Sequence, residues 1–189
     1  MFETIHFRGS EKILREKRLQ KQVQETLECV DQDLHERFNR GTLLKQTLDY
    51  MGWRDNGSLA ILEGRRYAYK GFRKGVAIEA NLINYEGILE GLFKLQVGFD
   101  KGNVEVGILL LNGYRSEKSP LATNVSLVCE DVEALYPTIS LPVTIVLFDF
   151  GKPKCIDPDG REEAEPAVKG GSKQANRNSN VEEVDVNDE

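Results

Sequence analysis

Two nearly uninterrupted apolar runs constrain the fold of this chain more than any other feature. They cover Val104–Leu111 and Leu141–Phe150, and each is far shorter than the roughly 20 apolar residues that a membrane helix needs. A strand that is apolar on both faces has to be covered on both faces, which is typical of central strands in a sheet with helices on either side. The two runs therefore predict an α/β domain.

The segment before the first run predicts how the sheet is connected. Residues 76–82 alternate like a strand, residues 85–98 have helical spacing, and residues 104–111 form the next strand. This βαβ unit predicts two parallel strands with a right-handed crossover. Two further strands are predicted at 59–62 and 66–72, joined to the unit through Arg73-Lys74-Gly75 as a tight connection. The fold class is therefore α/β, with a mixed β-sheet flanked by helices.

The N-terminal part, residues 10–52, is predicted to be helical. One long helix is expected over 10–39, with Ser10 as its cap, and a second short helix follows Thr42 and ends at Gly52. A further helix is expected over 127–135. The long helix carries a narrow apolar stripe, which either packs into the core or forms the surface of a possible homodimer. The stripe consists of Val23, Leu27, Val30, Leu34 and Phe38.

Charge divides the chain into two parts. The formal net charge is −6, and all of it comes from residues 156–189, which are rich in Glu, Asp, Asn, Gly and Ser. We expect one domain over residues 1–155, with its sheet core at 59–150, and a disordered acidic tail over 156–189. The three cysteines are widely spaced and there is no apolar signal segment, so a cytoplasmic protein without a membrane span is expected.

A local excess of positive charge lies in the middle of the neutral body. Arg65, Arg66, Arg73 and Lys74 occur within ten residues, interleaved with aromatic side chains. Such a patch can contact phosphates, so these four residues are candidate contacts to double-stranded DNA. A solvated surface without a ligand is the alternative interpretation.

Glu79 is the most informative single residue. It lies in the middle of an apolar strand, where a carboxylate is costly unless it has a partner. If Arg73 and Lys74 form a two-residue turn, Lys70 lies opposite Ala77 and reaches Glu79 diagonally on the same face. Glu79 therefore either binds a divalent cation or forms an ion pair with Lys70.

Here the sequence resembles the BglII-type restriction endonucleases of the PD-(D/E)xK superfamily. The resemblance rests on Glu79-Ala80-Asn81, the following helix, and Val106-Gly107-Ile108 in the next apolar strand. It covers about half of the chain and implies a restriction-endonuclease-like core that acts on DNA. It also implies Mg²⁺-dependent phosphodiester hydrolysis, with Glu79, Asn81 and Lys70 as catalytic residues.

One departure from the family weakens the implied metal site. The family has an Asp nine residues before the Glu, and this chain has Lys70 there. An ammonium group repels Mg²⁺, which prefers anionic oxygens. Glu63 is a candidate replacement ligand beside Glu79 and Asn81, with Lys70 stabilising charge. The alternative is a nuclease fold that has lost catalysis and serves as a non-catalytic interaction module.

Overall fold

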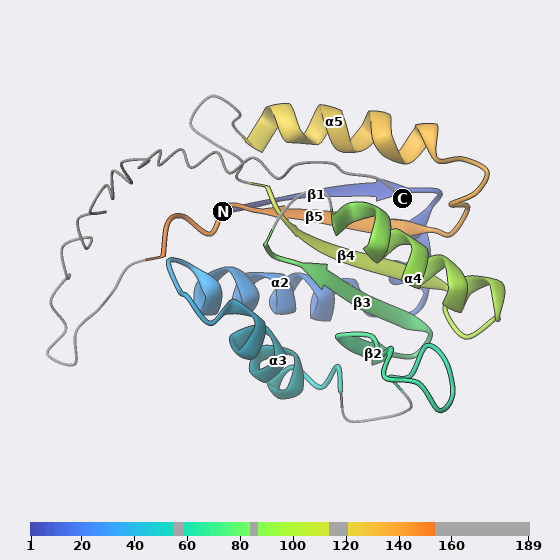
Figure 1. The fold of residues 1–189 in the computed structure, drawn as a ribbon, viewed down its shortest axis with the longest axis horizontal. Helices are drawn as coiled ribbons and strands as arrows, with labels where there is room; N and C mark the ends of the chain where they lie inside the picture. The colour runs from blue at the N-terminus through green and yellow to red at the C-terminus, as the bar shows by residue number, and fades with distance from the viewer. Residues whose placement is uncertain (55–58, 84–86, 114–120, 154–189) are drawn as a thin grey trace, which may run out of the picture. The chain divides into compact units, whose positions relative to one another are not determined.

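The core of the protein is one five-stranded mixed sheet with strand order β1-β5-β4-β3-β2. The computed structural model describes residues 1–54, 59–83, 87–113 and 121–153. In the sheet, β3, β4 and β5 are mutually parallel, and an antiparallel strand closes each edge (Figure 1). This confirms the mixed sheet and the parallel βαβ pair. The strands are β1 (Phe2–Phe7), β2 (Gly71–Arg73), β3 (Val76–Asn81), β4 (Val106–Asn112) and β5 (Val143–Phe148).

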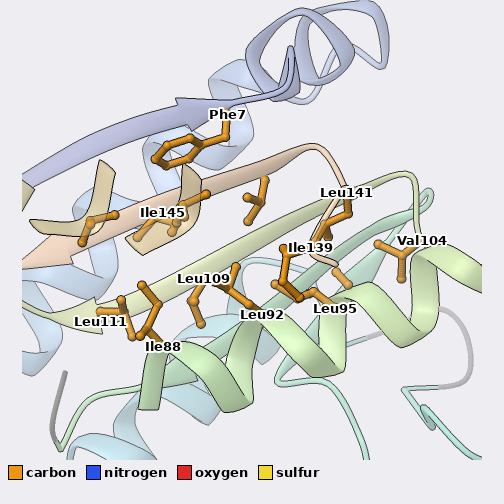
Figure 2. Packing of buried hydrophobic residues seen from close by; sticks show 14 of the residues in the cluster. Phe7, Ile88, Leu92, Leu95, Val104, Leu109, Leu111, Ile139, Leu141 and Ile145 are labelled. Carbon is orange, nitrogen blue, oxygen red and sulfur yellow. The ribbon is translucent and has the colours of Figure 1, made fainter. Parts of the chain in front are cut away.

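Helices cover both faces of the sheet, so that two hydrophobic clusters lie on opposite sides of it (Figure 1). The first cluster joins α4 and α5 to one face, and Figure 2 shows Leu92 and Leu95 of α4 packed near Leu109. The second joins α1, α2 and α3 to the other face. Burial on both sides explains why β4 and β5 are apolar at almost every position. The helices are α1 (Ser10–Glu16), α2 (Gln20–Leu34), α3 (Arg40–Tyr50), α4 (Ile88–Asp100) and α5 (Leu121–Ala134).

The predicted single helix over 10–39 is wrong, because the chain breaks it after Glu16 and ends it at Leu34. Arg18 has a positive φ of 57°, which no helix accommodates. The break lets Leu19 turn inward, where it is 2% exposed. Ser10 is also not a cap: it is the first helical residue, and its hydroxyl accepts a hydrogen bond from Thr144 in β5.

The apolar stripe of α2 belongs to the core of one chain. Val23, Leu27, Val30 and Leu34 are all buried in the second cluster, against β3, β4 and β5. Phe38, which was expected to extend the stripe, lies beyond the helix and is 61% exposed. The stripe is therefore not available as a surface for a homodimer.

The edges of the sheet differ most from the sequence-based expectation. Strand β1 was not predicted, and it pairs with β5 along its whole length. The two strands expected at 59–62 and 66–72 reduce to one isolated bridge, Ala60 to Ala68, and the three-residue strand β2. Edge strands are short and only partly buried, so their periodic signal is weak.

The register of the β2–β3 hairpin differs from the predicted one by two residues. Phe72, not Lys70, lies opposite Ala77. The turn is formed by Lys74 and Gly75, which have φ values of 48° and 79°, as a two-residue hairpin turn requires. A shift of two residues keeps every side chain on its predicted face, but it changes which residues face each other.

None of the helices in the described residues is both long and apolar enough to cross a membrane. The chain divides into two units, Met1–Lys154 and Cys155–Glu189. The acidic tail predicted over 156–189 lies outside the described residues and stays a prediction.

Candidate functional site in a basic cleft

Glu79 lies on β3, on the face of the sheet that α4 covers, and it is 1% exposed. Alternation along the strand places Val76 and Ile78 under the N-terminal helices and Ala77 and Glu79 under α4. The Oε1 atom of Glu79 is buried and has no hydrogen-bond partner among the described residues. A buried carboxylate oxygen without a donor is costly and rare in folded proteins, so this position calls for a functional explanation.

The ion-pair partner of Glu79 is Lys94 on α4, and not Lys70 as the sequence suggested. The Lys94 Nζ atom lies 3.8 Å from Glu79 Oε2 and 2.7 Å from Glu90 Oε1. Partial burial lowers the pKa of Lys94, but the hydrogen bond to Glu90 and the charge of Glu79 together raise it above its usual value. Lys94 therefore stays charged while it contacts two carboxylates.

Burial dominates the ionisation of Glu79 and raises its pKa from 4.5 to about 7. The charges of Lys94 and Lys70 and the backbone N–H of Ala80 oppose this effect, and the charge of Glu90 adds to it. Tyr69 is the buried neighbour: burial and then the charge of Glu79 raise its pKa to about 12. The 3.8 Å distance to Lys94 is too long for a hydrogen bond, which fits a carboxylate that is poorly compensated.

Glu79 and Lys94 line a cleft of about 850 Å³ at the C-terminal end of β3. The walls come from α3 and the residues before it, from the segment before β2, and from α4. Among the lining residues that the structure describes, lysine and arginine outnumber carboxylates by seven to two. Such a cleft concentrates a positive field and attracts anions. The seven basic residues are Arg37, Arg40, Lys45, Arg54, Arg66, Lys70 and Lys94, and the two acids are Glu79 and Glu90.

Apart from Lys94, the basic residues of the cleft fall into two groups. Arg40 donates hydrogen bonds to the carbonyl groups of Phe150 and Gly151, and Arg54 pairs with Asp49 at 2.6 Å, so both hold the fold together. In contrast, four residues are exposed and have no carboxylate within 4 Å in the described part of the chain. These four form the free basic surface of the cleft: Arg37, Lys45, Arg66 and Lys70.

The structure brings together some of the residues selected from the sequence and leaves others apart. The residues that line the cleft are Glu79, Asn81, Lys70 and Arg66. Those that do not line it are Glu63, Arg65, Arg73 and Lys74. Arg73 and Lys74 lie at the hairpin turn, which is the opposite end of β3 from the cleft, and Arg73 donates a hydrogen bond to the carbonyl of Gly52.

Asn81 has a structural task at the end of β3. Its Oδ1 accepts a hydrogen bond from the backbone N–H of Ile83 at 3.2 Å, which shapes the turn after the strand. Its side chain also packs directly over Gly87, where a β-carbon would collide with it. Asn81 thus helps to place the start of α4, which carries Glu90 and Lys94.

Lys94, Glu90, Arg37 and Lys45 are functional candidates that the sequence did not reveal. The spacing of Glu90 and Lys94, four residues apart on a predicted helix, was a visible signal for an ion pair. The sequence offered no sign that this pair faces Glu79. Arg37 and Lys45 come from a region that is distant in the chain, so only the packing of α2 and α3 on the sheet brings them to the cleft.

The residues around Glu79 fit Mg²⁺ poorly. The described residues contain no group of three or more His, Cys, Asp or Glu side chains that could hold a metal ion. The two carboxylates of the cleft in the described residues already share the Lys94 ammonium, and Lys70 adds a second positive charge nearby. Mg²⁺ needs an octahedron of hard oxygens and is repelled by both ammonium groups.

We expect two double-mutant cycles to separate the two lysines. At pH 8, the coupling free energy between Glu79→Gln and Lys94→Met should be about 1–3 kcal/mol, because the two charges are close and largely buried. The coupling between Glu79→Gln and Lys70→Met should be below about 0.5 kcal/mol, because Lys70 is exposed and screened by water. Urea unfolding measures both. A larger coupling with Lys70 would contradict the geometry.

Comparisons with known proteins identify the fold. The sequence matches no protein-family model, and no curated protein matches it. Two solved structures are similar. The crystal structure of restriction endonuclease BglII complexed with a DNA 16-mer has a TM-score of 0.51 and 16% identity, with 79% of this chain and 76% of that chain covered. The crystal structure of free BglII has a TM-score of 0.50 and 16% identity, with 78% and 79% covered. The five-stranded mixed sheet with its flanking helices is therefore a restriction-endonuclease-like fold.

Proposed function

We propose that this protein binds duplex DNA along its sugar-phosphate backbone in the basic cleft, without metal-dependent cleavage. The observation that carries the proposal is the free basic surface of the cleft, Arg37, Lys45, Arg66 and Lys70, which lines a concave site of about 850 Å³ in a restriction-endonuclease-like fold. Exposed cations without carboxylate partners are free to neutralise phosphates and release counterions.

The DNA complex of BglII supports duplex DNA as the ligand class, although the identity is 16%. A small anion such as free phosphate would not need four cations that come from two separate segments of the chain. Contacts to the DNA backbone position a protein on the duplex but do not distinguish one base sequence from another. The four cations are therefore proposed to determine the affinity for DNA and not a sequence preference.

The binding experiment compares three variants over a salt series. The cleft variant Arg37→Ala/Lys45→Ala/Arg66→Ala should bind a duplex oligonucleotide more weakly. The slope of log K against log[salt] should fall by about 0.9 for each phosphate that is no longer neutralised, or about 2.7 for all three substitutions. Fluorescence anisotropy with a labelled duplex measures both quantities. The control is Lys12→Ala/Lys21→Ala, which removes two exposed lysines on α1 and α2 that do not line the cleft.

The same series tests the basic patch selected from the sequence. The hairpin variant Arg65→Ala/Arg73→Ala/Lys74→Ala removes the three patch residues that do not line the cleft. If this variant loses the salt slope and the cleft variant keeps it, DNA binds to the hairpin surface and the cleft proposal fails. If all variants bind duplex DNA equally, the protein is an interaction module of another kind.

Metal-dependent phosphodiester hydrolysis is the second candidate function. One observation favours it: the unpartnered Oε1 of Glu79 lies at the floor of the cleft, where a metal ligand would be useful. Incubation of supercoiled plasmid with the wild type and Mg²⁺ or Mn²⁺ tests it. Nicking that disappears in Glu79→Gln would establish hydrolysis and would overturn binding without cleavage.

A further inference from the structure

Among the described residues, Lys94 differs from the other cations of the cleft because it contacts two carboxylates at once. Its ammonium group lies 3.8 Å from Glu79 Oε2 and 2.7 Å from Glu90 Oε1. Glu79 is held on the central sheet and Glu90 sits one turn before Lys94 on α4, so the two acids approach from different elements. The Lys94 side chain is 27% exposed and faces the cleft.

Carboxylates that converge from two elements on one positive charge resemble a cation site that is already filled. The second oxygen of Glu79, Oε1, is buried without a hydrogen-bond donor in the described part of the chain, which is costly for a protein that contains only the ion pair. A divalent cation could bind both oxygens of such a carboxylate, whereas an ammonium 3.8 Å from Oε2 leaves Oε1 uncompensated.

We propose that the Lys94 ammonium occupies the place of a divalent cation between Glu79 and Glu90, so that this chain carries a built-in cation and a latent metal site. With Lys94 in place, a metal would meet an ammonium group only a few ångströms away. Like charges only a few ångströms apart repel strongly in a partly buried site, so the wild type excludes Mg²⁺ and Mn²⁺. Removal of the ammonium leaves two carboxylates and space for water ligands.

Mn²⁺ binding, followed by the decrease of the free-ion signal in electron paramagnetic resonance at pH 8, tests this inference. The wild type should bind no Mn²⁺ that depends on Glu79. Lys94→Met should bind about one Mn²⁺ per chain, with an apparent affinity at least about tenfold above that of the wild type. Lys94→Met/Glu79→Gln should lose this site. Lys21→Met is the matched control, because it removes a lysine from another Glu–Lys pair four residues apart, outside the cleft.

A wild type that binds Mn²⁺ through Glu79 would overturn the inference, as would a folded Lys94→Met protein without Mn²⁺ binding. Circular dichroism melts verify folding, and Lys94→Gln replaces Lys94→Met if the latter does not fold. A DNA arm rests on the proposed function: duplex binding by the wild type should be no stronger in Mg²⁺ than in EDTA, because without a metal site Mg²⁺ only competes with the protein for DNA phosphates. Failure of DNA binding alone would count against the proposed function, while the Mn²⁺ result would still decide the metal site.

Discussion

The wild type is expected to lose stability as the pH rises from 4.5 to about 7, and Glu79→Gln is expected to abolish this loss. Burial raises the pKa of Glu79 from 4.5 to about 7, so the folded state favours the protonated acid more than the unfolded state does. The associated stability is fully present below pH 4.5 and is lost as the pH rises through the folded-state pKa. At about 1.4 kcal/mol per pH unit, the loss is about 3 kcal/mol and is complete slightly above pH 7.

The amide introduced by Glu79→Gln carries no charge at any pH, so the variant should be more stable than the wild type at pH 8 and similar to it at pH 4.5. Urea unfolding at both pH values measures the difference between the two proteins, in which the titration of all other groups cancels. The control is Glu3→Gln, an exposed carboxylate on β1, which should leave the difference near zero. A Glu79→Gln protein that is less stable than the wild type at pH 8 would mean that Lys94 compensates Glu79 fully.

Trp53→Ala is expected to cost about 3–5 kcal/mol of unfolding free energy, as is typical for a large buried aromatic residue. Trp53 is 0% exposed and belongs to the cluster under β3 and β4. Its indole N–H donates to Thr26 Oγ1 at 2.8 Å, and its carbonyl accepts from Phe72 of β2 at 2.7 Å. It therefore ties α2 to the edge strand beside the cleft.

Two smaller changes separate the contributions of Trp53. Thr26→Val keeps the volume but leaves the indole N–H without its acceptor, which should cost about 1–3 kcal/mol. Trp53→Phe removes the N–H together with part of the ring and should fall between Thr26→Val and Trp53→Ala. Circular dichroism has to follow the unfolding, because Trp53 is the only tryptophan in the chain. A cost below about 1 kcal/mol for Trp53→Ala would contradict the tight packing at this position.

The local pattern of the sequence was sufficient to predict the centre of the sheet. The apolar runs at 104–111 and 141–150 correspond to β4 and β5, and the alternating segment 76–82 corresponds to β3. An apolar run is a local signal, and it is strong where both faces of a strand are buried. The same alternation placed Glu79 on the buried strand and on its correct face. The order of these elements was enough to predict a restriction-endonuclease-like fold by resemblance, and the two similar structures support this fold.

The residues that meet Glu79 depend on tertiary packing and could not be predicted from the sequence. The predicted partner was Lys70, because a hairpin brings nearby residues together, but Lys94 reaches Glu79 through the packing of α4 on the sheet. Which side of a helix faces the sheet depends on the whole apolar face of that helix, so it cannot be predicted from a single residue such as Lys94. The cleft is non-local in the same way, because Arg37, Lys45 and Arg66 come together only when α3 and the segment before β2 are placed beside β3. Charge in a sequence is counted along the chain, whereas a binding site is made by the distances between charges after folding.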